Sequence, residues 1–105
     1  MAKISLEPNP TFDAVVSIPR PGLDNASVRF TFRHRSRTAV LTWVESIGKD
    51  EKVDIDQVMD VASGWELDDT FTRENVALLC ENYGGASRAI LETYLRELRG
   101  AREKN

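Results

Sequence analysis

The fold of this chain is indicated most clearly by its last stretch, residues 62–105, which reads ASGWELDDTFTRENVALLCENYGGASRAILETYLRELRGAREKN. Thr72 can cap the start of a helix, and Phe71 before it can pack onto that helix as a hydrophobic staple. The Gly84–Gly85 pair offers the residue of positive φ that commonly ends a helix, and Ser87 then starts another. The stretch therefore predicts an αα-hairpin, and it contains no catalytic motif.

Two segments nearer the start of the chain alternate apolar and polar residues with the period of a β-strand. They cover Phe12–Ile18 and Val28–Arg33. Between them, Pro19–Ser27 is rich in Pro, Gly, Asp and Asn, which predicts a turn region. An isolated two-stranded ribbon is marginally stable in water, so its apolar face needs a cover. We expect a β-hairpin over residues 12–33, preceded by a loosely ordered arm over residues 1–11.

A helical cover is predicted downstream of the hairpin. Ser36 can cap a helix that Gly48 would end. Its apolar residues recur at i, i+3, i+4 and i+7 and are Val40, Trp43, Val44 and Ile47. A second helix has an apolar face made of Ile55, Val58, Met59 and Ala62. Since Gly64 is expected to end this second helix, we expect Trp65 to pack from a bend or a short extended segment.

Together these elements predict an α+β fold in a single domain over residues 1–105. An N-terminal β-hairpin packs on about four α-helices, the last two of which form the C-terminal αα-hairpin. The helical part is expected over residues 36–100, and residues 101–105 are expected to form a frayed tail. A chain of 105 residues buries roughly 65% of its extended surface, which supports a core without metal or disulfide crosslinks.

Composition excludes several classes of protein. The chain is 41% hydrophobic and 30% charged, which is ordinary for a globular domain. Its net charge of −3 argues against a general affinity for nucleic acid or anionic membranes. The apolar runs are too short for a membrane-spanning helix. Cys80 is the only cysteine, so no intramolecular disulfide is possible and a reducing cytoplasm is the simplest inference.

The densest charged feature is a basic cluster made of Arg29, Arg33, His34, Arg35 and Arg37. One interpretation is a patch that contacts phosphates, because a guanidinium group binds phosphate oxygens in a fork. This would suit a small nucleic-acid-binding regulator using the Arg29–Arg37 segment. The favoured interpretation is charge pairing within the chain or between subunits, since the chain is acidic overall.

Other reactive residue types are expected to be structural. His34 is the only histidine and has no second ligand for a metal site. Cys80 falls on an apolar helix face and is expected to be a packed thiol. The carboxylates of residues 50–69 lack the spacing of a calcium loop and are expected on helix surfaces. We therefore expect no enzyme activity, no catalytic residue, no cofactor and no metal.

Several large aromatic side chains remain, and most belong in the core by default. A chain this small can keep part of such a surface for a partner, and Trp and Tyr are favoured in interfaces because they add area at little entropic cost. The candidate partner-binding residues are Trp65, Phe71, Tyr83 and Tyr94. A small ligand-binding domain or enzyme would need a pocket with converging polar groups, and the sequence displays none.

The order of these segments resembles a known family. It runs from VRFTFRHRSR (28–37) and VMDVASGWEL (58–67) to FTRENVALLCENY (71–83) and SRAILETYLRELRGAREKN (87–105). The pattern is similar to the tail assembly chaperones of siphophage-like bacteriophages and prophages, over most of the chain from about Phe12. The Gly64–Trp65 step, the 71–83 helix and the terminal run carry most of the likeness.

The resemblance implies a non-enzymatic protein of the host cytoplasm that coats the tape measure protein before the tail tube forms. Such a protein helps recruit tail tube subunits, in some members through a longer frameshifted form, and is absent from the mature virion. Self-association is compatible with this role, and neither a membrane nor nucleic acid is expected as a partner. A different virion component, such as a minor tail or connector protein, remains the alternative within phage assembly.

Overall fold

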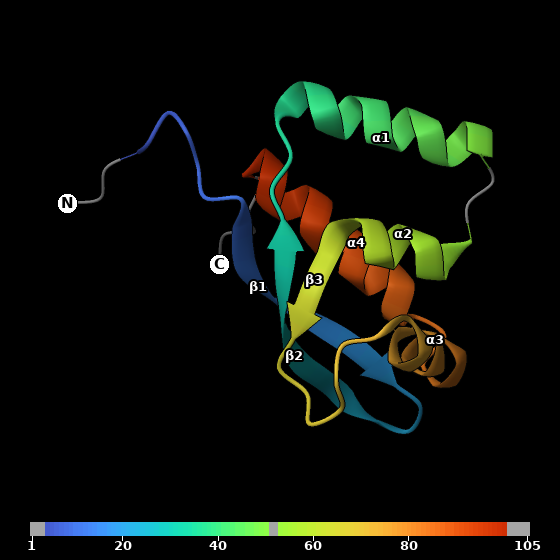
Figure 1. Cartoon of the computed structure of the whole chain (residues 1–105). Coiled ribbons are helices and arrows are strands. Elements are labelled where there is room, and N and C mark those ends of the chain that lie inside the picture. Colours follow the sequence, from blue (N-terminus) through green and yellow to red (C-terminus); the bar gives the residue numbers. More distant parts are fainter. Residues whose placement is uncertain (1–3, 51–52, 101–105) are drawn as a thin grey trace.

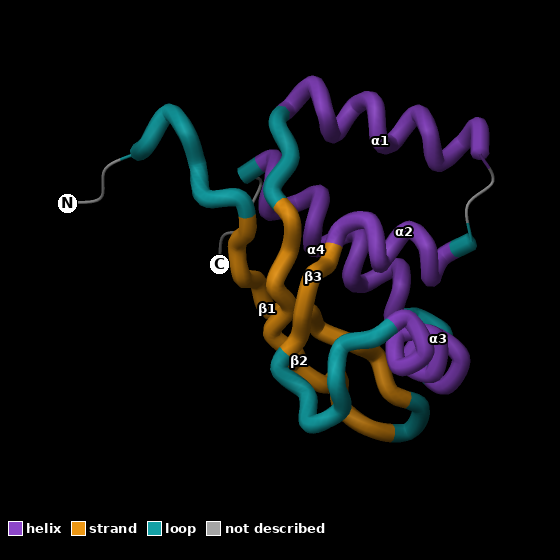
Figure 2. Tube along the Cα trace, viewed as in Figure 1, coloured by secondary structure: helices purple, strands orange, loops and turns teal. Residues whose placement is uncertain are grey.

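The computed structural model describes residues 4–50 and 53–100. The elements run in the order β1 (Thr11–Arg20), β2 (Leu23–Arg33), α1 (Arg37–Asp50), α2 (Asp54–Val61), β3 (Ala62–Trp65), α3 (Arg73–Asn82) and α4 (Ala86–Arg99) (Figure 1). The strands form one antiparallel sheet in the order β1-β2-β3, with the helices gathered beside it (Figure 2). The predicted α+β class, with an N-terminal hairpin and C-terminal helices, is confirmed.

The two strands of the β1–β2 hairpin are longer than the sequence predicts. The turn lies inside the predicted turn region Pro19–Ser27, but that region is too long, because pairing continues to Arg20 opposite Leu23 and only Pro21 and Gly22 form the turn. Gly22 has a φ of 72°, which a residue without a Cβ adopts at no steric cost. Pro19, which lacks an N–H, is tolerated because β1 is an edge strand and the register shifts beside it.

The hydrophobic core lies between one face of the hairpin and the helices. Alternate residues point to this face, as the strand period requires, and are buried: Ala14, Val16, Ile18, Val28, Phe30 and Phe32. Helix α4 packs against β1, and α2 packs against both α3 and α4. The opposite face is polar except for Val15, and there Thr31 donates a hydrogen bond to Asp13 across the strands at 2.9 Å.

A third strand extends the sheet at the point where Trp65 was expected to leave the helix. The extended segment is confirmed, but Ala62 belongs to β3 rather than to the apolar face of α2. Phe30 pairs with Trp65 across the strands, and the backbone N–H of Glu66 donates to the carbonyl of Arg29 at 2.9 Å. The chain leaves the helix here because the open edge of β2 carries backbone groups that need partners.

Two predicted helix starts are confirmed. The backbone N–H of Ala39 donates to the Oγ of Ser36 at 3.1 Å at the start of α1. That of Asn75 donates to the Oγ1 of Thr72 at 3.1 Å at the start of α3. One predicted stop is wrong, since α1 continues through Gly48 to Asp50.

The turn between α3 and α4 also differs from the prediction. Neither Gly84 nor Gly85 has a positive φ, and α4 begins at Ala86 rather than at Ser87, with Gly85 as its N-cap at a φ of −93°. The reason for a glycine here is close approach, because a Cβ on Gly85 would lie 3.2 Å from the Cγ of Pro19. The turn between α3 and α4 therefore lies close to Pro19, at the far end of the hairpin.

The described part of the predicted N-terminal arm, residues 4–10, has no helix or strand and is exposed. Thr11, expected in the arm, is the first residue of β1. The backbone N–H of His34 donates to the carbonyl of Pro10 at 2.8 Å, which ties the end of the arm to the end of β2. Residues 1–3 of the arm and the predicted frayed tail, residues 101–105, lie outside the described residues.

Candidate partner-binding groove

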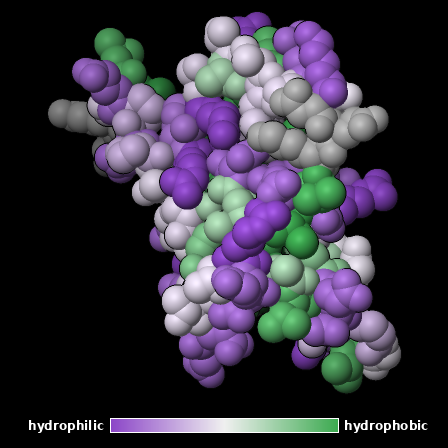
Figure 3. Space-filling view, turned by 45° about the vertical axis from the view of Figure 1, so that its right-hand side comes forward, coloured by the Kyte–Doolittle hydropathy of each residue, from purple (hydrophilic) through white to green (hydrophobic). Residues whose placement is uncertain are grey.

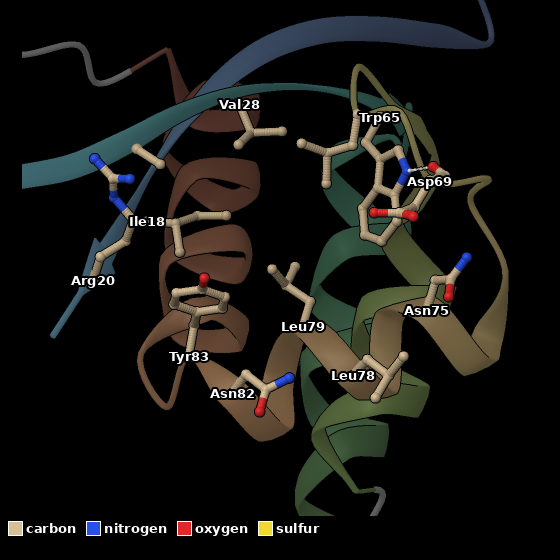
Figure 4. Close-up of a pocket in the computed structure, with 12 residues that line it drawn as sticks. Ile18, Arg20, Val28, Trp65, Asp69, Asn75, Leu78, Leu79, Asn82 and Tyr83 are labelled. Atoms are coloured by element: carbon tan, nitrogen blue, oxygen red, sulfur yellow. Dashed lines mark hydrogen bonds between the residues drawn. The ribbon is translucent and has the colours of Figure 1, made fainter.

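An open groove lies between the far end of the β1–β2 hairpin and helix α3. Its volume is about 450 Å³. The hairpin contributes apolar side chains that include Ile18 and Val28. From the opposite side α3 contributes Leu78 and Leu79, and Tyr83 directly follows that helix (Figure 4). The groove therefore has an apolar lining from two elements that are far apart in the sequence.

Helix periodicity explains why α3 forms one wall of the groove. Its lining residues are spaced at i, i+3, i+4 and i+7, which is one helix face: Asn75, Leu78, Leu79 and Asn82. Leu78 stands out because 58% of it is exposed. A large apolar side chain this exposed, beside a groove that is itself apolar, is a feature typical of a binding surface.

Trp65 forms the end wall of the groove and is held firmly. Its indole Nε1 donates to the backbone carbonyl of Asp69 at 2.7 Å (Figure 4). Its ring meets Phe30 edge to face, with centroids 5.8 Å apart, and Phe71 in the same way at 5.1 Å. Because the ring is fixed from both sides, Trp65 presents a rigid aromatic surface that loses little entropy when a partner binds.

The four predicted partner-binding residues separate into two groups. Trp65 and Tyr83 line the groove, and Phe71 supports Trp65 through its ring contact. Tyr94 is in the core, with no exposed surface. Tyr94 therefore contributes no surface to the groove.

The position of Tyr94 follows from its hydrogen bonds. The hydroxyl donates to the backbone carbonyl of Arg33 and accepts from the guanidinium of Arg35, both at 2.9 Å. The ring packs among Phe32 and Trp43, with centroids 5.4 and 5.9 Å away. A tyrosine can be fully buried when its hydroxyl finds partners in this way.

Sequence reasoning missed the exposed Leu78 and the hairpin side of the groove. Leu78 adjoins Leu79 in an apolar run, and the helical period predicted only Leu79 on the buried face. Ile18 and Val28 are recognisable as the buried face of the strands, yet their place beside α3 depends on how the chain packs.

In the view turned by 45° from Figure 1, hydrophobic side chains form separate patches among hydrophilic ones (Figure 3). The model of the phage tail assembly chaperone family matches residues 1–105, the whole chain. The chain belongs to the phage tail assembly chaperone family. No curated protein and no solved structure matches the chaperone significantly.

Two members of the basic cluster of the chaperone, Arg29 and Arg35, make contacts within the chain. Arg29 forms an exposed ion pair with Glu66, its Nε lying 3.5 Å from the carboxylate. Arg35 lies over the ring of Trp43, 5.4 Å from its centroid, and also donates to the backbone carbonyl of Asp60 at 3.1 Å. Charge pairing was predicted, but Arg35 instead uses neutral acceptors and an aromatic face. The contacts of Arg35 therefore join the end of β2 to α1 and α2.

Cys80 of the chaperone packs against the core from α3 and is half-buried. Burial, and secondarily the negative charge of Asp54, raises the pKa of its thiol from 9.0 to about 11. The thiol is therefore protonated near neutral pH, which fits the predicted packed cysteine.

The described residues of the chaperone offer neither a metal site nor a membrane-spanning helix. Within residues 4–50 and 53–100, no cluster of three or more His, Cys, Asp or Glu side chains is arranged to hold a metal. No helix in the same ranges is long and apolar enough to cross a membrane. A second hollow of about 380 Å³ lies beside the N-terminal arm, with Asp13, His34 and Glu97 among its lining residues.

Proposed function

We propose that this chaperone binds the tape measure protein of its phage through the groove between the hairpin and α3. It acts as a non-catalytic binding protein in the cytoplasm of the bacterial host. The observation that supports the proposal is the apolar groove, with Leu78 exposed on one wall and the rigid Trp65 at its end.

The physical demands of the role agree with this surface. A tape measure protein is a long, helix-rich polymer whose apolar stripes are exposed until the tail tube encloses it. A groove that accepts a few apolar side chains from a helix gives contacts that are specific but moderate in strength. Many copies can then cover the polymer and be displaced one after another as tube subunits arrive.

Co-expression with the cognate tape measure protein tests the binding step. We expect the tape measure protein to stay soluble and to co-purify with the chaperone. Leu78→Asp, which puts a charge into the groove, should abolish both effects. Leu41→Asp is the matched control, because Leu41 is 62% exposed on α1 and does not line the groove.

Two results would contradict the proposal. One is a tape measure protein that is equally soluble without the chaperone. The other is a Leu78→Asp variant that binds it as well as the wild-type chain. The circular dichroism spectrum of both variants should match the wild type, so that loss of binding is not confused with loss of fold.

We also propose that the chaperone helps recruit tail tube subunits and then leaves the tail. Adding purified tube protein to the complex of chaperone and tape measure protein should produce tubes and release free chaperone. Mass spectrometry of purified mature particles should find none of this chain. Its presence in particles in amounts comparable to other tail proteins would instead identify a minor tail or connector protein.

A further inference from the structure

We propose that the groove prefers an amphipathic helix whose apolar stripe is bordered by Lys and Arg residues. The inference rests on the proposed function and specifies which segments of a helical partner are bound. It is carried by the apolar lining of the groove together with the charges that surround it.

The α3 wall of the groove is acidic around its exposed apolar residue. Glu74 lies one turn before Leu78 and Glu81 lies one turn after it, so both flank Leu78 on the outer side of the helix. Both are exposed, as is Leu78. A helix that inserts apolar side chains beside Leu78 thus passes these two carboxylates.

The loop before α3 adds negative charge at the end of the groove where Trp65 stands. Leu67 and Asp69 both line the groove, and Asp68 lies between them in the chain. All three side chains are exposed. Glu66 also belongs to this loop, but it is paired with Arg29 and contributes less.

Positive charge around the groove does not balance these carboxylates. In the part of the chain that the structure describes, Arg20 is the basic residue of the lining, and its Nε donates to the backbone carbonyl of Asp24 on the hairpin. Arg73, at the start of α3, forms an ion pair with Asp56 on α2. The border of the groove along α3 and its preceding loop therefore carries excess negative charge.

This charge determines which helix the groove accepts. An apolar stripe alone would bind any amphipathic helix, including acidic ones. A negative border attracts a helix with basic flanks during encounter and disfavours an acidic one through like-charge repulsion. Since the carboxylates are exposed, the preference should be strong at low salt and weak when the Debye length falls to a few ångströms.

Two synthetic peptides of about 18 residues, five helical turns, test the inference. They share one Leu/Ala stripe and differ only in its flanks, which are Lys and Arg in one peptide and Glu in the other. Fluorescence anisotropy of labelled peptides measures binding to the full chain. We expect the basic peptide to bind about tenfold more tightly at low salt, and the difference to fall to about twofold at roughly 0.5 M salt.

Variants of the chaperone assign the preference to the groove. The double substitution Glu74→Gln/Glu81→Gln should remove most of the difference between the peptides and leave the fold unchanged. The control Glu7→Gln/Glu45→Gln removes the same charge from exposed positions on the N-terminal arm and on α1, away from α3 and its preceding loop. It should keep the preference.

The outcomes separate this inference from the proposed function. Equal affinities, a tighter acidic peptide, or a preference that survives Glu74→Gln/Glu81→Gln would each overturn the inference while the tape measure protein still co-purifies. The same holds if neither peptide binds but the tape measure protein does. Sedimentation of the free chain tests a second copy as the occupant, and dimers abolished by Leu78→Asp would also overturn it. Loss of tape measure binding is a failure of the proposed function alone.

Discussion

Removing one hydroxyl, in Tyr94→Phe, should destabilise the whole chain. The hydroxyl joins three parts of the fold, since it donates to the carbonyl of Arg33 at the end of β2 and accepts from Arg35, which lies over Trp43 of α1. The phenyl ring keeps its place among the core aromatics. The substitution therefore removes hydrogen bonds without opening a cavity.

The loss in free energy of unfolding can be estimated from the polar group that loses its hydrogen-bond donor. The partly buried carbonyl of Arg33 loses its donor, which costs about 1–3 kcal/mol. Arg35 keeps its bond to the carbonyl of Asp60 and adds little to the loss. We expect the free energy of unfolding to fall by about 2 kcal/mol. With an unfolding entropy of about 2.1 cal/mol/K per residue, this lowers Tm by about 9 °C.

Urea denaturation and a thermal melt, both followed by circular dichroism, measure the change. Tyr83→Phe is the matched control, because the half-buried Tyr83 lines the groove and its hydroxyl makes no hydrogen bond within the described chain. Its free energy of unfolding should stay within about 0.5 kcal/mol of the wild type. If the two variants were equally stable, the account of Tyr94 as a hydrogen-bonded joint would be refuted.

Three further perturbations test other features of the fold. Gly85→Ala should lower the free energy of unfolding, since the new Cβ meets Pro19 at 3.2 Å and Ala is a poor N-cap. The control Gly84→Ala, whose Cβ meets nothing within 4 Å, should leave it unchanged, and equal melting temperatures of the two variants would contradict this. Thr72→Ala should cost about 1 kcal/mol by urea denaturation, because it removes the acceptor at the start of α3, and an unchanged midpoint would argue against the cap. Cys80, with its pKa raised to about 11, should react with a disulfide reagent at pH 8 about tenfold more slowly than in the unfolded chain, because the smaller thiolate fraction outweighs its greater nucleophilicity. Equal reaction rates in the folded and unfolded chains would contradict the raised pKa. The stability that this thiol contributes is present below about pH 9 and is lost as pH rises through 11.

Sequence reasoning succeeded where the deciding interactions are local. The caps at Ser36 and Thr72 depend on a backbone N–H three residues away, and the strand period depends on alternate residues. It failed over Pro19–Ser27, where turn-forming residues are held in strands by pairing across the hairpin. For example, the side-chain amide of Asn25 on β2 donates a hydrogen bond to the Oγ of Ser17 on β1 at 3.0 Å.

The candidate groove was predicted only in part, for the same reason. Trp65 and Tyr83 were recognised as large aromatics with possible surface roles, but Tyr94 has an equivalent signature. Tyr94 differs from Tyr83 because its hydroxyl donates to the carbonyl of Arg33. That carbonyl is distant from Tyr94 in sequence and lies next to it only in the folded chain. Contacts between side chains that are distant in sequence produce no local pattern from which a single sequence could predict them.

Helix α1 is weakly attached to the rest of the fold and should unfold before the sheet does. This helix is held mainly by Trp43, whose indole Nε1 donates to Asp60 at 3.1 Å, with Ile47 packed against the core, while Leu41 and Val44 face solvent. Few buried apolar contacts mean a low free energy of local opening. Backbone amides of α1 should therefore exchange with deuterium well before those of β1 or α4, so that this helix unfolds as a separate unit while the sheet stays intact.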